Sequence, residues 1–403
     1  MTELQNNKPR KLIILGSTGS IGENTLNVVR HLKDTVGVSI DVVGLAAGRG
    51  GDRLIEQAKA FDVKHIAIGD VSQTGKIKNA LPGVTVFSGD GSTQQLVEAV
   101  EATDLAAAVV GSAGLPATVA AIQRGMRVSL ANKETLVAAG ELVTPLVRKY
   151  GAQLLPVDSE HSAIFQCLHD HPNRMVKRIV LTASGGPFRQ KDKQTIDNAT
   201  VEEALDHPTW NMGPKITIDS ASMMNKALEI IEAHWLFDLP GEQIDVIVHP
   251  QSIVHSFVEF VDHSVLAQLG PPDMKTPIQH ALTHPERVGG VSDAMDWQDL
   301  SGLTFEQPDH ERFGSLKLAY DVIEAGGTAG AIFNAANEAA VGAFLDRKIR
   351  FGQITELVTE ALSATEIKPA DSLETVMQAD VDARAFVDKL ISKLDDQKLT
   401  GTA

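Results

Sequence analysis

The sequence has one cysteine, a shortage of basic residues and no long apolar run, and each shortage excludes a class of protein. Cys167 alone cannot form an internal disulfide or a cysteine-rich zinc site, and its apolar flanks favour a buried thiol over a catalytic one. Lysine and arginine total 36 against 52 acidic residues, which argues against nucleic acid or an anionic membrane as a partner. A small anionic substrate is not excluded, because an acidic protein can hold a local basic pocket.

No segment approaches the roughly 20 apolar residues of a membrane-spanning helix. The first residues, MTELQNNKPR, are polar and show no apolar segment of a secretory signal. Together with the single cysteine, these features lead us to expect a protein of the reducing cytoplasm.

The 403 residues suffice for about two to four domains. Short apolar stretches alternate with helical patterns up to residue 156, which predicts an α/β fold with a Rossmann-like, doubly wound and mostly parallel sheet. The expected strands are 11–15, 41–47, 65–68, 105–110, 127–130 and 153–157.

A glycine-rich turn follows the first expected strand. Gly16, Gly19 and Gly22 lie in GSTGSIG, between that strand and a helix. Glycines permit a tight turn and close approach of the backbone to a pyrophosphate, while the helix N-terminus supplies N–H donors. The spacing is GxxGxxG and not the usual GxGxxG, so the position after a strand carries much of the argument for a dinucleotide. The alternative is a turn without a ligand.

The end of the second strand indicates which dinucleotide would bind. NAD sites usually place an acid there for the ribose hydroxyl. Here Arg49 comes first and Arg53 follows one turn later, on either side of Asp52. Two guanidinium groups suit a 2′-phosphate, so we expect NADPH; the alternative is a solvated basic helix start.

Three polar residues follow a later strand. Asn132, Lys133 and Glu134 come directly after the stretch 127–130 and open a long helix. Strand ends of such sheets line the ligand crevice, so we expect these residues near the nicotinamide half of the cofactor. Asn132 could also cap the helix.

Two carboxylates follow the last of these strands. Asp158 and Glu160 are one residue apart, and on an extended strand end such residues point to the same side. The pair suits a hard divalent cation, which binds oxygen ligands, but a third ligand is needed. The alternative is that Asp158 or Ser159 only caps the following helix.

A helix predicted over 219–232 offers that third ligand. Asn225, Lys226 and Glu229 fall on one face of it together with Ser222, and Ser220 lies at its N-terminus, where anions bind favourably. A polar stripe is commonly a solvated face. It would equally suit a pocket that holds a phosphate at one end and a metal at the other, with Glu229 as a metal ligand.

Two loops in this region can contact a substrate. Ser184 precedes two glycines, an arrangement that can cradle a phosphate or form a plain turn. The irregular segment DHPTWNMGPK carries Trp210 and Met212, and large apolar residues on such a loop must cover something. We expect a mobile lid over the substrate, with packing onto a neighbouring helix as the alternative.

The remaining sequence predicts structural elements and no further catalytic residues. Residues 249–251 and 253–261 suggest strands of an antiparallel sheet, and Phe257 and Phe260 need burial, which suggests a dimer surface. Helical patterns at 329–345 and 373–394 predict a C-terminal helical bundle.

Seven motifs, taken in order, closely resemble the 1-deoxy-D-xylulose 5-phosphate reductoisomerase family: GSTGSIG, ANKETL, PVDSEHSAIFQCL, LTASGGPF, HPTWNMG, DSASMMNKALEIIEA and GPPDMKTPI. The resemblance runs from residue 11 to about residue 345. It implies a metal-dependent isomerisation of 1-deoxy-D-xylulose 5-phosphate, followed by NADPH reduction to 2-C-methyl-D-erythritol 4-phosphate in isoprenoid precursor biosynthesis. The implied partners are this small phosphorylated sugar and a second copy of the chain, with no nucleic acid or membrane.

The resemblance also implies a role for each matching residue. The implied ligands of Mg²⁺ or Mn²⁺ are Asp158, Glu160 and Glu229. The implied substrate contacts are Ser159, Glu160, Ser184, His207, Trp210, Met212, Ser220, Asn225, Lys226 and Glu229, with Lys226, Glu160 and His207 as the catalytic set. The implied NADPH contacts are Thr18, Gly19, Ser20, Ile21, Gly48, Arg49, Asn132, Lys133, Glu134 and Gly213.

Four regions are expected on this basis. Residues 1–156 would bind NADPH, and 157–290 would form a central α/β domain for catalysis and dimerisation, with the lid. Residues 291–313 would be a linker and 314–403 a C-terminal helical bundle.

The general base is left open among Lys226, Glu160 and a metal-bound water. Two rival functions are also open. A metal-free NADP-dependent dehydrogenase would need a nucleophilic cysteine or a histidine–carboxylate pair, and the one cysteine is expected to be buried. A non-catalytic nucleotide sensor would leave the three carboxylates without a purpose.

Overall fold

The structure, a computed structural model, describes residues 10–168, 171–210 and 212–400. The chain divides into two compact units. Unit 1 contains the described residues up to Thr135, together with Val143–Phe165 and Asp273–Ala294. Unit 2 contains Leu136–Leu142, Gln166–Pro272 and the described residues from Met295 onwards.

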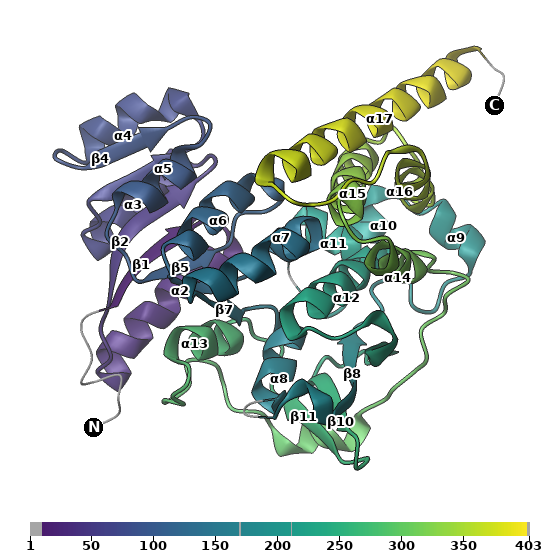
Figure 1. Cartoon of the computed structure of the whole chain (residues 1–403), viewed down its shortest axis with the longest axis horizontal. Helices are drawn as coiled ribbons and strands as arrows, with labels where there is room; N and C mark the ends of the chain where they lie inside the picture. The colour runs from purple at the N-terminus through teal and green to yellow at the C-terminus, as the bar shows by residue number, and fades with distance from the viewer. Residues whose placement is uncertain (1–9, 169–170, 211, 401–403) are drawn as a thin grey trace. The chain divides into compact units, whose positions relative to one another are not determined.

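Unit 1 is built on a sheet of seven parallel strands in the order β4-β3-β2-β1-β5-β6-β7 (Figure 1). The strands are β1 Arg10–Leu15, β2 Ile40–Ala47, β3 His65–Ile68, β4 Thr85–Ser88, β5 Asp104–Ala107, β6 Arg127–Leu130 and β7 Gln153–Pro156. Residues 12–15 of β1 are fully buried, because helices cover both faces of a parallel sheet and leave the central strand no access to water. The strand order reverses between β1 and β5, and their carboxyl ends are where this topology binds ligands.

The helices of unit 1 follow the strands as βα units require. They are α2 Ser20–His31, α3 Gly51–Phe61, α4 Thr74–Ala80, α5 Ser92–Ala99, α6 Leu115–Gln123 and α13 Lys275–Thr283, while α7 Glu134–Tyr150 and α8 Ser159–Leu168 contribute residues to both units. Helix α13 comes from far along the chain and contacts α2. Arg127 on β6 holds the C-terminal end of α13, because its Nη2 donates to the carbonyl of His284 at 2.9 Å. The predicted α/β fold with a Rossmann-like sheet is confirmed.

Two details of the sheet differ from the sequence prediction. Strand β4, with the sequence TVFS, was not predicted. Strand β5 ends at Ala107 and not at Val110, whose side chain is 69% exposed. The Asn132 amide donates to the carbonyls of Val109 and Gly111, which holds this segment outside the strand ladder.

Unit 2 contains a four-stranded sheet in the order β11-β10-β8-β9. Its strands are β8 Val176–Ala183, β9 Ile244–Val248, β10 Val254–Phe260 and β11 Val265–Leu269, with only the β8–β9 pair parallel. The antiparallel strand predicted at 253–261 is present, but the strand predicted at 249–251 is wrong, because this segment is a turn after β9. The His249 ring fixes that turn, since Nε2 accepts the N–H groups of Ile253 and Val254 at 3.2 Å each.

The helices of unit 2 are α9 Lys193–Asp197, α10 Val201–Leu205, α11 Pro214–Ala221, α12 Met224–Phe237, α14 Ser315–Ala325, α15 Ala329–Leu345, α16 Gln353–Ala364 and α17 Leu373–Thr400. Helix α15 contacts α14, α16 and α17, which confirms the predicted C-terminal bundle (Figure 1). Among the described residues, no helix is long and apolar enough to cross a membrane.

The single helix predicted over 219–232 is wrong. Helix α11 ends at Ala221 and α12 begins at Met224, with Met223 in the left-handed region at φ 59°. The Ser222 hydroxyl donates to the carbonyl of Ile218 at 3.0 Å, so the side chain competes for backbone groups, as serine does where helices end. Residues 222 and 223 therefore form a joint between two helices.

Candidate active site

The glycine-rich turn of unit 1 requires its glycines. A Cβ on Gly16 would collide with the Ala108 backbone, and a Cβ on Gly22 would collide with Gly16 and Ser17. The turn therefore packs against the backbone of Ala108, the residue that follows β5, and α2 begins at Ser20. Gly19 and Ser20 are exposed, and Thr18 and Ile21 are half-buried. The N–H of Gly19 is donated to the carbonyl of Gly16 at 3.0 Å, so N–H donors for a ligand would come from the N-terminus of α2.

The two arginines after β2 have different surroundings. Arg49 is exposed, between Gly48 and Gly50. Arg53 lies between two carboxylates, with Nε 2.5 Å from Glu23 and Nη1 2.7 Å from Glu56, and these bonds raise the pKa of Arg53. Of these two arginines, Arg53 is held between two acids, whereas Arg49 is exposed.

Asn132 holds the start of α7. Its Oδ1 accepts the N–H of Thr135 at 3.0 Å, although the N-cap residue of α7 is Lys133, and its Nδ2 donates to the carbonyl of Gly111 at 3.0 Å and to Glu134 at 2.9 Å. Asn132, Lys133 and Glu134 are all buried. These three polar side chains are thus fixed at the carboxyl end of β6.

The first carboxylate pair lies at the start of a helix. Asp158 precedes α8, and Glu160 is in its first turn, so the strand-end geometry assumed for them is wrong. They nevertheless offer carboxylate oxygens within 4.8 Å of each other, because the helix turns back beside Asp158. Lys133 donates to Asp158, and the Ser159 hydroxyl donates to Glu160 at 2.5 Å. Asp158 also accepts the N–H of the adjacent Ser159 at 3.1 Å.

In unit 2 the predicted phosphate loop meets the end of α11. A Cβ on Gly186 would lie 2.8 Å from the carbonyl oxygen of Ser220, and its φ is +63°. Glycine is therefore needed to bring the turn after β8 against the last turn of α11. Ser184 and Ser220, predicted 36 residues apart as substrate contacts, are placed together by this close approach.

His207 orients the Ser184 hydroxyl. Its Nδ1 accepts the N–H groups of Thr209 at 3.1 Å and Trp210 at 2.9 Å, so the proton of the neutral ring is on Nε2. Nε2 lies 3.0 Å from Ser184 Oγ, which also accepts the N–H of Gly186 at 3.2 Å. Because Oγ accepts two bonds, its own proton points towards a further acceptor. Burial lowers the pKa of His207, which favours this neutral form.

The polar face of α12 is not solvated. Lys226 is 3% exposed and Glu229 is fully buried, so the solvated-face alternative is wrong. Lys226 donates to Glu229, and Asn225 Nδ2 donates to the same carboxylate at 2.5 Å. Burying charged groups costs free energy unless they are paired and hydrogen-bonded, as they are here. The charged groups of α12 therefore form a polar site that exists before any ligand binds.

The lid segment comprises residues 206–210 and 212–213. Trp210 and Met212 are half-buried, and Gly213 is exposed at the N-cap of α11. The contact between His207 Nε2 and Ser184 Oγ described above joins this segment to the turn after β8. Its closure over a substrate stays a prediction.

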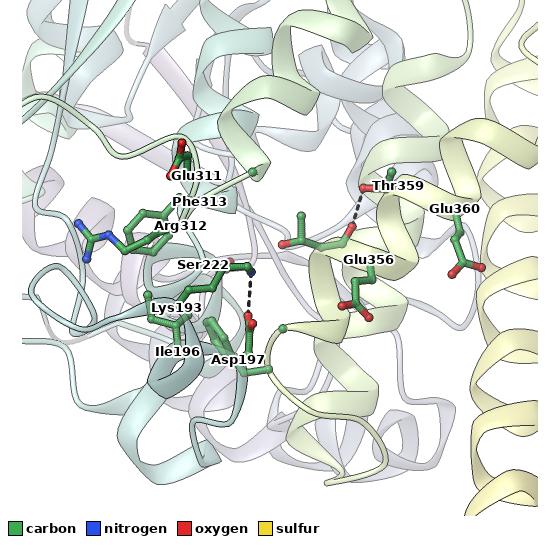
Figure 2. Close-up of a pocket in the computed structure, with 14 residues that line it drawn as sticks. Lys193, Ile196, Asp197, Ser222, Glu311, Arg312, Phe313, Glu356, Thr359 and Glu360 are labelled. Atoms are coloured by element: carbon green, nitrogen blue, oxygen red, sulfur yellow. Dashed lines mark hydrogen bonds and ion pairs between the residues drawn. The ribbon is translucent and has the colours of Figure 1, made fainter. Parts of the chain in front are cut away.

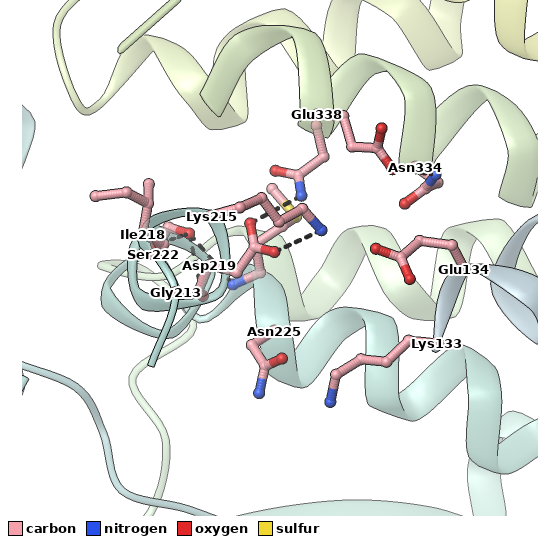
Figure 3. Close-up of polar contacts among 12 residues, drawn as sticks. Lys133, Glu134, Gly213, Lys215, Ile218, Asp219, Ser222, Asn225, Asn334 and Glu338 are labelled. Carbon is pink, nitrogen blue, oxygen red and sulfur yellow. Dashed lines mark hydrogen bonds and ion pairs between the residues drawn. The ribbon is translucent and has the colours of Figure 1, made fainter. Parts of the chain in front are cut away.

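A buried ion pair of α11 was missed by the sequence interpretation. Lys215 and Asp219 pair at 2.8 Å, as Figure 3 shows, and Asn337 on α15 donates to Asp219 at 2.9 Å. The i,i+4 spacing of Lys215 and Asp219 was visible in the sequence, but the contact with Asn337 was not.

A cavity of about 390 Å³ lies elsewhere in unit 2, among α9, α16 and the segment 311–314 (Figure 2). Ile196, Phe313 and Phe351 line it, with charged groups such as Arg312 and Glu356. It contains none of the substrate residues predicted from the sequence, although Ser222 of the α11–α12 joint is in its wall.

Comparison with known families covers most of the chain. The model described as 1-deoxy-D-xylulose 5-phosphate reductoisomerase matches residues 12–140, and its C-terminal domain matches residues 154–237. A further model, DXP reductoisomerase C-terminal domain, matches residues 269–386.

Curated relatives carry the same name along their full length. A 1-deoxy-D-xylulose 5-phosphate reductoisomerase of Pelodictyon phaeoclathratiforme is 49% identical over 385 residues, which cover 95% of this chain and 100% of the relative. That of Chlorobium chlorochromatii is 50% identical over 379 residues, covering 93% and 98%.

Solved structures are similarly close. The reductoisomerase from Zymomonas mobilis in complex with NADPH has a TM-score of 0.87 at 44% identity, covering 96% of this chain and 99% of that one. A DOX-P reductoisomerase in complex with NADPH, fosmidomycin and magnesium has a TM-score of 0.90 at 40% identity, with the same coverage.

Proposed function

The chain belongs to the 1-deoxy-D-xylulose 5-phosphate reductoisomerase family, and from this premise we propose which residues carry out its reaction. The enzyme isomerises 1-deoxy-D-xylulose 5-phosphate and reduces the product with NADPH to 2-C-methyl-D-erythritol 4-phosphate, and it depends on a divalent metal. The observation that carries the assignment of roles is the buried Glu229–Lys226–Asn225 group on α12, which has the charges for a metal at one end and a phosphate at the other.

NADPH binding is assigned to unit 1. Thr18, Gly19, Ser20 and Ile21 would hold the pyrophosphate, since their turn presents N–H groups at the N-terminus of α2. Gly48 and Arg49 would contact the adenosine end. Asn132, Lys133 and Glu134 would lie near the nicotinamide, because they occupy the carboxyl end of β6, and Gly213 would approach from the lid.

The cofactor preference gives a first test. We expect Arg49→Ala to weaken NADPH about tenfold while changing NADH little, because the lost partner is the 2′-phosphate. Arg53→Ala is the matched control: its guanidinium is held by Glu23 and Glu56, so both dinucleotides should bind as before. Fluorescence titration of the two cofactors measures both changes. An equal loss of NADPH and NADH in Arg49→Ala would show that Arg49 does not contact the 2′-phosphate.

The metal is assigned to three carboxylates. Magnesium is present in a related structure, and we extend the choice to Mn²⁺. Asp158, Glu160 and Glu229 would be the ligands, since hard cations bind carboxylate oxygens. The residues fit such an ion: two of the carboxylates converge within 4.8 Å, and the third is buried with its charge already balanced. When bound, the ion polarises the substrate carbonyl and stabilises the charge that develops there.

The phosphate subsite is assigned to unit 2. Ser184 would donate its hydroxyl proton to a phosphate oxygen, because its Oγ already accepts from His207 and Gly186. Ser220 joins it through the Gly186 contact, and Asn225 and Lys226 supply an amide and a positive charge. A phosphate held away from the reacting carbons orients them for the rearrangement.

The remaining residues would contact the reacting end of the substrate. Ser159, between two metal ligands, would bind a substrate oxygen. Trp210 and Met212 would cover the substrate and exclude water from the reactive intermediates. Lys226, Glu160 and His207 form the proposed catalytic set.

The neutral state of His207 predicts a pH dependence. Burial lowers its pKa below the ordinary 6.5, so between these two values the unfolded chain binds more protons than the folded one. Stability due to the neutral ring is therefore complete above pH 6.5 and is lost as the pH falls through the folded pKa. We expect the urea midpoint to fall over this window, and substrate KM to rise as the bonds to Thr209 and Trp210 break.

His207→Gln is the comparison for this test. Glutamine does not titrate, so the variant should show a flatter midpoint between about pH 5 and about pH 7 than the native protein. Parallel curves for the two proteins would mean that His207 contributes nothing to the pH dependence.

We propose four functional regions: NADPH binding in 1–156, catalysis and dimerisation in 157–290, a linker in 291–313 and bracing helices in 314–403. A homodimer is supported by β11, an edge strand of the unit 2 sheet with Val265 54% and Leu266 44% exposed. Phe260, expected in the interface, is instead buried against His171. A cytoplasmic location is supported by the single cysteine, since a reducing compartment suits NADPH-dependent reduction.

The experiment that tests this function is NADPH oxidation with 1-deoxy-D-xylulose 5-phosphate. We expect the absorbance of NADPH to fall only when substrate and Mg²⁺ or Mn²⁺ are both present, with 2-C-methyl-D-erythritol 4-phosphate as product. Folded protein that binds NADPH yet gives no turnover with metal would exclude the proposal.

A further inference from the structure

Helix α11 carries its two charges in the unfavourable order. Lys215 lies in the first turn, where the helix dipole disfavours a cation, and Asp219 lies in the last turn, where it disfavours an anion. An i,i+4 pair with the basic residue first is also the weaker orientation in helices. The pair therefore adds little to α11 as an isolated helix, and its value must come from contacts outside the helix.

That contact is made by the C-terminal bundle. Asp219 is 1% exposed, and its two carboxylate oxygens are used separately: Oδ2 pairs with Lys215 at 2.8 Å and Oδ1 accepts Nδ2 of Asn337 at 2.9 Å. Asn337 is fully buried in α15, and its Oδ1 has no hydrogen-bond partner within the part of the chain that the structure describes. Asn334 of the same helix also has an unsatisfied Oδ1 among the described residues, but its amide bonds within α15. What distinguishes Asn337 is that its bond reaches α11.

The position of Asp219 indicates what the bond controls. The next residue is Ser220, whose carbonyl meets Gly186 of the phosphate loop. Three residues after Ser220 is Met223 of the joint, after which α12 carries Asn225 and Lys226. The Ser315 hydroxyl on α14 donates to the carbonyl of Ser222 at 2.8 Å, so the joint too is held by the bundle.

We propose that Asp219, held by Lys215 and Asn337, is a positioning residue for the substrate phosphate. The anchor fixes the last turn of α11 so that Ser220 and the start of α12 keep their places around the phosphate. The C-terminal helices thereby take part in substrate binding through α15, beyond bracing the fold. The inference rests on the proposed function for the assignment of the phosphate subsite.

The test is a double-mutant cycle on the Asp219–Asn337 bond. Asn337→Asp places two carboxylates against each other, and we expect KM for the phosphorylated substrate, and the inhibition constant of inorganic phosphate, to rise about tenfold. Adding Asp219→Asn restores one donor and one acceptor with their roles exchanged, so both constants should return most of the way. The Kd of NADPH should stay unchanged throughout.

Asn334→Leu is the matched control. Asn334 lies one turn earlier on the same helix, is equally buried and bonds Glu338 of α15 at 2.9 Å, not α11. It should lower the melting temperature without changing KM or phosphate inhibition. The proposal is overturned if Asn337→Asp only lowers the melting temperature or kcat, if the second substitution fails to restore phosphate binding, or if Asn334→Leu weakens phosphate equally.

Phosphate binding also separates this inference from the proposed function. Calorimetry with inorganic phosphate needs no turnover, so it can be measured in the native protein, the single variants and the double variant. Absence of NADPH oxidation with unimpaired, Asn337-dependent phosphate binding would exclude the reaction and keep the anchor. Turnover together with phosphate binding that does not depend on Asn337 would support the reaction and exclude the anchor.

Discussion

Glu229→Gln is expected to lower turnover about a thousandfold while leaving NADPH affinity unchanged. The amide has nearly the same size and still accepts a bond from Asn225, so α12 should still form, although the variant should be less stable because Lys226 loses its anion. It lacks the negative charge that a hard cation requires from its ligand. The effect on kcat should be accompanied by a much higher requirement for Mg²⁺.

Turnover is measured by NADPH oxidation over a metal titration, and NADPH binding by fluorescence in the same samples. Loss of both turnover and NADPH binding would point to misfolding and not to a missing metal ligand. Native turnover in Glu229→Gln at low metal concentration would remove Glu229 from the metal site.

Lys226→Met should have the second largest effect, and on stability as well as activity. Lys226 and Glu229 are 3% and 1% exposed, so removing the ammonium leaves a buried carboxylate without its cation. Breaking such a pair costs about 3–5 kcal/mol of unfolding free energy. Substrate binding should also be lost, because Lys226 is the proposed cation of the phosphate subsite.

The double variant Lys226→Met/Glu229→Gln separates the two effects. With no buried charge left, most of the stability should return, while activity should not. Lys193→Met is the matched control for losing a lysine: its pair with Asp197 is exposed, so less than about 1 kcal/mol is expected. Urea unfolding measures all three. A stable Lys226→Met protein would show that the pair is not needed to neutralise Glu229.

Local sequence patterns predicted the parallel sheet of unit 1 and the glycine-rich turn at 16–22. The glycines of GSTGSIG and the apolar stretch of β1 are determined by neighbours in sequence, so their geometry follows from the pattern alone. Met223 could not be predicted in the same way. A long side chain rarely adopts a positive φ, and the hydrophobic period runs through the joint as if one helix continued.

Pairings between distant residues were also beyond the sequence. Arg53 was assigned to the cofactor phosphate because its partner Glu23 is 30 residues away and on another helix. Asn337 contacts Asp219 across 118 residues, and no period or motif connects them. The sequence identifies which residues can do the chemistry, whereas the tertiary structure decides which of them are held by other side chains.

Manganese binding tests the central claim most directly, namely that Asp158 and Glu229 are ligands of a single cation. Electron paramagnetic resonance counts free Mn²⁺ in titrations of the native protein, Asp158→Asn and Glu229→Gln, with NADPH and inorganic phosphate present. We predict one site in the native protein and a large, similar loss of affinity in both variants. Tight binding of one Mn²⁺ by either variant would contradict the account.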